Sequence, residues 1–285
     1  MRARFWLAPL ALLLALAAPG RAQEKEDKEP GDYWGSIFAD FFMGPEKKDE
    51  FRWQGRIAPG ATLEIKGVNG RVVAEPATGR EIELVATKRG RRNDPKEVQI
   101  AFAEHEGGLT VCALYPPASD APANECKPGK GGRMRVHHND VAVDFVVKVP
   151  EGVSFVARTV NGGVRVTGLS ANVEAYTVNG SVRLEASGHA QAETVNGSIR
   201  ASLGKTDWKD ALSFRTVNGS VVVALPAAAS ASVRVETVNG SISNDLTLTG
   251  ATKTTRRELQ GTIGGGGREL QVKTVNGSVT LRRAS

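Results

Sequence analysis

The sequence predicts an all-β protein, a β-solenoid or β-helix-like stack of short strands that turn at Asn-Gly bends. First, the tetrapeptide Thr-Val-Asn-Gly occurs six times, at 159–162, 177–180, 194–197, 216–219, 237–240 and 274–277, with a looser copy at 67–70. Second, apolar and polar residues alternate on both sides of each copy, as in half-buried strands. Third, the asparagines of the six copies are 18, 17, 22, 21 and 37 residues apart. A period near twenty indicates one supersecondary unit used repeatedly.

Asn-Gly is also the strongest short-range signal for a β-hairpin, so an antiparallel meander or a β-sandwich is the alternative. We favour the solenoid because valine precedes asparagine in every main copy, which stacking of identical coils would explain. The 37-residue interval spans about two periods and holds a degenerate turn at 261–265. The residues expected to stack at the bends are Asn69, Asn161, Asn179, Asn196, Asn218, Asn239 and Asn276.

Residues 1–22 predict a secretory signal peptide, with Arg2 and Arg4 before an apolar stretch and small residues before a cut at Gln23. No second long apolar run follows, so we expect no transmembrane segment in the mature chain. Residues 23–50 form a charged and then aromatic segment. Its aromatic part is interpreted as a cap on the open end of the β core or as a membrane-surface contact, through Trp34, Phe38, Phe41 and Phe42.

Residues 51–285 are predicted to form a single β-repeat domain, with irregular strands over 61–150 and the repeats over 151–285. In the irregular part, period-two alternation favours strands at 62–66, 81–86, 98–103, 109–114 and 141–149. Cys112 and Cys126 are the only cysteines. An even pair in an exported chain predicts a disulfide, which would close a loop rich in Pro, Ala, Asn and Asp.

Charge and motifs argue against several functions. The formal charge of +6 falls to +3 without residues 1–22, which is too weak to indicate a nucleic-acid partner. Carboxylates do not recur at one repeat position, as a polysaccharide-cleaving site would need. His137-His138-Asn139-Asp140 is predicted to be a solvated turn leading into Val141. Adjacent histidines on a strand would point to opposite faces and could not chelate one ion as a pair. We therefore expect no metal, no cofactor and no enzyme activity.

Binding residues are expected on the outward face of the repeats. The residue three before each asparagine varies, which is typical of a solvent-facing position. Within that set the candidate binding surface is Arg158, Tyr176, Arg215 and Lys273, and the basic loop 127–135 is a second candidate. A basic loop of this kind could contact an anionic glycan or a lipid headgroup.

Three segments carry a resemblance to a known family: TVNGSV, VDFVVKVPEGVSFVARTVNGGVRVTGL (143–169) and GTIGGGGRELQVKTVNGSVTL (261–281). Over 51–283 the chain resembles a bacterial family of exported β-strand-repeat proteins named "putative adhesins", with a domain of unknown function. The resemblance implies a β-solenoid-like fold in the periplasm or at the cell surface, and no site residues to carry over.

The function expected from the sequence is a non-catalytic envelope or cell-surface scaffold that binds an envelope protein or glycan. A polysaccharide-active enzyme and an envelope regulatory or stress-sensing module are the alternatives.

Overall fold

The structure is a computed structural model and describes residues 44–204, 208 and 210–284. The predicted signal peptide and the aromatic residues Trp34, Phe38, Phe41 and Phe42 lie outside the described residues. The described residues belong to a compact unit, Met43–Ser285. Apart from one 3-10 turn (Pro95–Glu97), its regular elements are strands, so the all-β prediction is confirmed.

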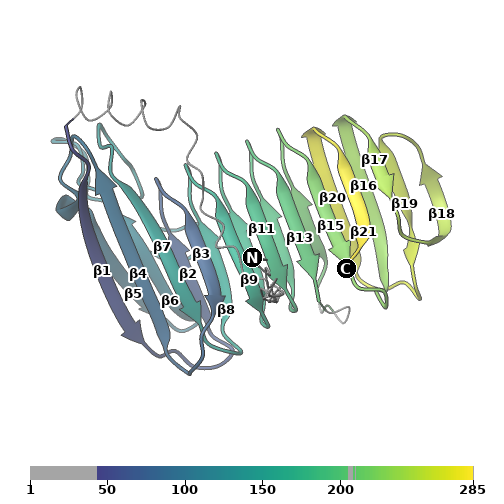
Figure 1. Cartoon of the computed structure of the whole chain (residues 1–285), viewed down its shortest axis with the longest axis horizontal. Helices are drawn as coiled ribbons and strands as arrows, with labels where there is room; N and C mark the ends of the chain where they lie inside the picture. The colour runs from purple at the N-terminus through teal and green to yellow at the C-terminus, as the bar shows by residue number, and fades with distance from the viewer. Residues whose placement is uncertain (1–43, 205–207, 209, 285) are drawn as a thin grey trace, which may run out of the picture. The chain divides into compact units, whose positions relative to one another are not determined.

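The described strands form two sheets (Figure 1). Sheet A contains, in spatial order, β1 (Lys47–Gly55), β4 (Ile82–Gly90), β7 (Ala142–Val149), β3 (Val72–Pro76), β9 (Val164–Leu169), β11 (Val182–Ala186), β13 (Ile199–Leu203), β15 (Val221–Leu225), β21 (Val279–Arg283) and β17 (Ile242–Asn244). Sheet B contains β18 (Leu248–Thr254), β19 (Glu258–Ile263), β16 (Ala231–Asn239), β20 (Glu269–Asn276), β14 (Leu212–Arg215), β12 (Ala190–Glu193), β10 (Val173–Tyr176), β8 (Ser154–Arg158), β2 (Thr62–Lys66), β6 (Gly108–Leu114) and β5 (Gln99–His105).

Each central repeat is one coil, in which a strand of sheet B enters the Asn-Gly corner and a strand of sheet A leaves it. Successive coils pair in parallel and in register, so Ala157, Ala175 and Ala192 stand in one row. The inward residues of the strands pack into one hydrophobic core, in which Phe155 and Leu184 are fully buried. The solenoid prediction is therefore confirmed, and the meander does not describe the repeats.

The seven corner asparagines form a continuous column of side-chain amides. In six of the seven, Nδ2 donates to the Oδ1 of the neighbouring asparagine, with distances from 2.7 to 2.9 Å, and Asn69 at the end of the column only accepts. Such amide ladders also occur in stacked in-register β structures, where each coil offers its neighbour the same partner. The predicted turn residues are thus brought together, in the order Asn69, Asn161, Asn179, Asn196, Asn218, Asn276 and Asn239.

The threonine and glycine of the repeat serve the same stacking. Thr177 is buried, and its Oγ1 donates to the carbonyl oxygen of Gly162 in the preceding coil at 2.8 Å. A Cβ on Gly180 would lie 2.1 Å from that same oxygen. Positive φ, the usual reason for Asn-Gly in hairpins, applies at only one of the seven corner glycines, Gly70. Glycine is required here because a neighbouring backbone occupies the space of a side chain.

The valine of the repeat stands in the stack but points outward. Val160, Val178, Val195, Val217 and Val238 are 36–51% exposed. A hairpin would also point this residue outward, so burial does not explain why the valine is invariant. Its backbone takes part in stacking, as where the carbonyl of Val160 accepts the Asn179 N–H at 2.7 Å.

The order of coils in the stack differs from their order in the chain. β20 pairs in parallel with both β14 and β16, and β21 with both β15 and β17. The last coil, formed by β20 and β21, therefore lies between two coils that precede it in the chain. Figure 1 shows these yellow strands between greener ones. The interval before it holds the β18–β19 hairpin, which extends sheet B antiparallel to β16. Of the degenerate turn expected at 261–265, residues 261–263 are the end of β19 and residues 264–265 begin the turn to β20, and this segment is not part of the asparagine column.

The N-terminal end of the stack is closed by antiparallel strands. β2 and β3 form the first coil; β6 and β7 extend it in parallel, and β5, β4 and β1 complete the edges antiparallel. The five strands predicted in 61–150 correspond to β2, β4, β5, β6 and β7, whereas β1 and β3 were not predicted. β1 starts at Lys47, before the sequence-based boundary at residue 51.

No helix among the described residues has the length and apolar character needed to cross a membrane.

Candidate functional site

The four predicted binding residues lie in one row on the outer face of sheet B. The register pairs Arg158 with Tyr176, Tyr176 with Glu193, Glu193 with Arg215, and Arg215 with Lys273. The structure therefore brings them together as the repeat pattern implied. Each polar group already has a partner within the chain, which reduces what it can offer to a ligand.

Arg158 is the most strongly held residue of this row. Its Nε lies 2.7 Å from Oε1 of the buried Glu64, and its guanidinium stacks 4.0 Å from the centre of the Tyr176 ring. The Tyr176 hydroxyl donates to Glu174 at 2.8 Å. Burial, together with the nearby Glu174 carboxylate, raises the pKa of Tyr176 to about 12. At neutral pH the phenol stays protonated, and this end of the row is a closed network.

The other half of the row is exposed but also paired. The Arg215 guanidinium donates to the side-chain oxygen of Gln271. Lys273 lies 3.3 Å from the carboxylate of Glu236. The hydrogen bond from Arg234 lowers the pKa of Glu236 most, and Lys273 lowers it further. Burial raises it, by less than Arg234 lowers it. Exposed pairs of this kind are worth about 0–1 kcal/mol and exchange readily with solvent or ligand.

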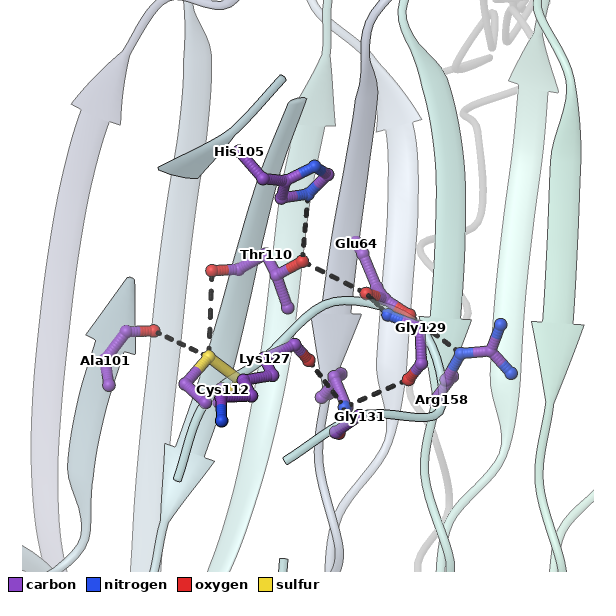
Figure 2. The surroundings of a disulfide bond; sticks show 11 residues. Glu64, Ala101, His105, Thr110, Cys112, Lys127, Gly129, Gly131 and Arg158 are labelled. Atoms are coloured by element: carbon purple, nitrogen blue, oxygen red, sulfur yellow. Dashed lines mark hydrogen bonds and ion pairs between the residues drawn. A yellow bond between two sulfur atoms is a disulfide. The ribbon is translucent and has the colours of Figure 1, made fainter. Parts of the chain in front are cut away.

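The predicted disulfide joins Cys112 on β6 to Cys126, with the Cα atoms 5.7 Å apart (Figure 2). The loop beyond Cys126 is anchored by the buried Lys66. Its Nζ donates to three backbone carbonyl oxygens, those of Lys127, Gly129 and Gly131, at 2.8, 3.1 and 2.8 Å. Burial lowers the pKa of Lys66, partly offset by Glu64. The basic loop is therefore tied to the sheet by both a covalent bond and an ammonium group.

Glu64 connects this loop to the predicted row. Its Oε2 accepts the Gly129 N–H at 2.8 Å and the Thr110 hydroxyl at 3.1 Å, while its Oε1 holds Arg158 (Figure 2). Two candidate surfaces that the sequence suggested separately are thus adjacent. Because Glu64 is buried and fully engaged, it holds the loop in place and is not available as a proton donor or acceptor for a substrate.

Sequence reasoning missed a second row, on the outer face of sheet A. Arg165, Arg183 and Arg200 are direct register partners on β9, β11 and β13. All three side chains are exposed. Each arginine stands four residues after the corner asparagine of its coil. That constant offset was the signal available in the sequence. The predicted binding surface was drawn only from the positions before each asparagine and so did not include these arginines.

The arginine row lies in a groove of about 460 Å³ that crosses β3, β9, β11 and β13. The charged residues that line it are Arg71, Arg165, Arg183, Arg200 and Glu75. The four strands are neighbours in sheet A, as Figure 1 shows. The groove is therefore strongly basic and runs along the stacking direction.

Two of these arginines have no partner within the part of the chain that the structure describes. Arg183 is paired with Glu185 on its own strand at 2.8 Å, whereas the side chains of Arg165 and Arg200 make neither a hydrogen bond nor an ion pair. Like charges opposite each other on adjacent strands are unfavourable, by roughly 1 kcal/mol per pair in water. The arrangement thus has a cost that a bound anion would remove.

A row of serines flanks the arginines. The Oγ of Ser181 accepts the backbone N–H of Ser198 at 3.2 Å, and the Oγ of Ser198 accepts that of Ser220 at 3.2 Å. Since a hydroxyl can accept and donate at once, the hydrogen of each hydroxyl is available to a ligand. The groove thus offers a neutral donor, Ser181, beside its arginines, whereas the coil of Arg165 has Gly163 in place of the serine.

The histidine pair lies outside the strands, as the predicted turn at residues 137–140 implies. His137 and His138 lie in a loop, with ring centroids 4.2 Å apart and edge to face, so they do not point to opposite faces of a strand. Among the described residues, no three His, Cys, Asp or Glu side chains are grouped closely enough to hold a metal ion.

A family model for Toastrack domains, DUF4097, matches residues 140–282, half of the chain. The chain belongs to the Toastrack family. The matched region of this Toastrack protein contains the arginine row and six of the seven corner asparagines. The first coil, the disulfide loop and the antiparallel strands β1, β4 and β5 precede it.

Several solved structures are similar to this Toastrack chain in parts of their fold. A "putative cell adhesion protein" from Clostridium sporogenes is 10% identical, covering 83% of this chain and 100% of that one, with a TM-score of 0.43. A "putative adhesin" from Bacteroides fragilis is 11% identical, covering 82% and 97%, with a TM-score of 0.30. Another from Parabacteroides merdae is 12% identical, covering 84% and 97%, with a TM-score of 0.26. A comparison with curated proteins finds no match.

Proposed function

We propose that this Toastrack protein is an exported, non-catalytic scaffold that binds a partner at the bacterial cell envelope or cell surface. The observation that carries the proposal is the register of its two sheets. Parallel pairing repeats each outward side chain at the strand spacing, so a few residue types build rows across several coils. Rows of this kind suit recognition of an extended partner.

Rigidity supports the same proposal. Each coil is held to the next by backbone hydrogen bonds, the asparagine column and the buried threonine hydroxyls. A surface that is ordered before binding loses little conformational entropy when the partner arrives. Several carboxylates along the repeats are paired with arginine or lysine, as in Arg183–Glu185 and Lys273–Glu236, and Glu174 accepts the Tyr176 hydroxyl.

Export is supported by two independent observations. Residues 1–22 have the pattern of a secretory signal peptide. The Cys112–Cys126 disulfide is of a kind that persists in oxidising compartments and is rare in the cytosol. The adhesin-like names of the similar structures agree with this placement but carry no weight at their low similarity.

The test is cell fractionation with protease shaving of intact cells, followed by a pull-down from envelope fractions with the mature chain. We expect the protein outside the cytoplasm and a specific protein or glycan partner. Cytoplasmic retention, or hydrolysis of an envelope polysaccharide by the purified protein, would contradict the proposal.

A further inference from the structure

We propose that the groove on the outer face of sheet A binds an extended anionic polysaccharide. In this arrangement, carboxylate or sulfate groups along the glycan meet Arg165, Arg183 and Arg200. This proposal rests on the proposed scaffold function and specifies an anionic glycan as the ligand and the outer face of sheet A as its binding surface. The face differs from the row of Arg158, Tyr176, Arg215 and Lys273 that the sequence suggested.

The charge of the groove calls for an anion. Four arginines and one glutamate line it. The glutamate, Glu75, is paired with Lys148. Arg165 and Arg200, which have no side-chain partner among the described residues, flank Arg183. A guanidinium presents two parallel N–H donors that match a carboxylate or a sulfate. An anion bridging neighbouring arginines would gain these bonds and relieve the repulsion between them.

The geometry favours a polymer over a single small anion. The arginines repeat at the spacing of neighbouring strands, about 4.8 Å, on a rigid sheet. That repeat is close to the length of one sugar residue in an extended glycan. A second groove of about 200 Å³ shares Arg183 and Arg200 with the first and adds Arg282 on β21. It also includes Glu185, the partner of Arg183, and β15 contributes only Val222 and Ala224, so the row of register-paired arginines ends at β13. The free hydroxyl hydrogens of Ser181 and Ser198 can donate to sugar oxygens beside the charged groups.

A lipid bilayer fits this face less well. Peripheral membrane binding combines basic residues with apolar side chains that enter the bilayer. The large hydrophobic residues that are exposed in the described part include Val146 and the corner valines, and none of them lines the groove. The polar lining of the groove is four arginines and Ser181, with one carboxylate, Glu75, that is paired with Lys148. Of its valines, Val72, Val164 and Val182 are buried and only Val73 is half-exposed.

The experiment measures binding of the mature chain to immobilised heparin, as the sulfated probe, and to polygalacturonate, as the carboxylated probe. Dextran serves as the neutral control. The test variant is Arg165→Gln/Arg200→Gln. The matched control is Arg256→Gln/Arg257→Gln, which removes the same charge from two exposed residues in the β18–β19 turn. Thermal unfolding of each variant checks that the fold is intact.

We expect the test variant to bind at least one polyanion about tenfold more weakly, because charge-assisted hydrogen bonds are lost. The control variant should stay within about twofold of the wild type, since exposed charges distant from the ligand are screened by salt. Dextran should not bind. Arg165→Lys/Arg200→Lys should fall between wild type and the glutamine variant, because lysine keeps the charge but loses the fork.

Equal binding by the test and control variants would overturn the proposal, as would a loss seen only in Arg215→Gln/Lys273→Gln. Stronger binding to phosphatidylglycerol vesicles or to duplex DNA than to either glycan would also overturn it. If no polyanion binds while the pull-down still recovers an envelope partner, the ligand class is wrong and the scaffold function stands. If the protein is cytoplasmic, the scaffold function itself fails.

Discussion

Replacing Gly180 by alanine tests whether close backbone approach is what the repeated glycine provides. Gly180 lies in the middle of the stack, with another coil on each side. A Cβ there would lie 2.1 Å from the carbonyl oxygen of Gly162 and 2.9 Å from the nitrogen of Gly163. Both atoms are backbone, so no flexible side chain can move aside.

The cost follows from the hydrogen bonds at that corner. Ordinary contact begins near 3.4 Å, so the two corners must separate by about 1.3 Å. Three hydrogen bonds across this corner would then become too long. They run from Thr177 Oγ1 to the Gly162 oxygen at 2.8 Å, from Asn179 Nδ2 to Asn161 Oδ1 at 2.8 Å, and from the Gly162 nitrogen to the Asn179 oxygen at 3.0 Å. Three bonds at about 1 kcal/mol each predict a loss of about 3 kcal/mol in the free energy of unfolding.

The measurement is urea and thermal unfolding followed by circular dichroism and by tryptophan fluorescence. A loss of this size corresponds to a fall in Tm of about 6–12 °C for a domain of this length. Two probes are needed because linear stacks can unfold in more than one step. The matched control is Gly79→Ala, which has no atom within 4 Å of its new Cβ and should stay within about 0.5 kcal/mol of wild type. If Gly180→Ala has the same Tm and free energy of unfolding as the control, close approach of the neighbouring coil is not the reason why glycine occupies this position.

Three further perturbations test other parts of the structure. Thr177→Val removes the donor to the Gly162 carbonyl, and urea unfolding should show a loss of about 1–2 kcal/mol; an unchanged midpoint would contradict the buried-hydroxyl role. Although burial favours its neutral form, backbone N–H groups of residues 91–93 lower the pKa of Asp140 to about 2 from 3.8. Its contribution is therefore present above pH 3.8 and lost as pH falls toward 2, so Asp140→Asn should cost about 1–2 kcal/mol at pH 7 and little near pH 2. A constant difference across that range would be inconsistent with this assignment. Lys66→Met removes the anchor of the basic loop, and limited trypsin digestion should cut that loop faster while the disulfide stays intact; equal cleavage rates would mean that the disulfide alone holds it.

Much of the repeat architecture was readable because each residue of the repeat has a stacking role that depends on the neighbouring coil alone. Asn179 bonds Asn161 and Asn196, and Thr177 bonds the preceding glycine. Local alternation also placed the strand pairs of the central coils correctly. The candidate row on sheet B was found for the same reason, since a fixed offset from the asparagine is a fixed place on the coil. The arginine row was equally readable, at the other offset, but was overlooked.

The sequence by itself determined the coil: its length, its corner, which side chains point inward, and the all-β class of the fold. Only the tertiary structure decided the order of the coils, because parallel pairing of β20 with β14 or with β16 satisfies the same pattern. It also decided that Arg158 is tied to Glu64, whereas the side chains of Arg165 and Arg200 have no partner in the part of the chain that the structure describes. A repeat specifies which contacts form between neighbours. Which coils become neighbours is a matter of long-range pairing, as where β20 and β21 lie between coils that precede them in the chain.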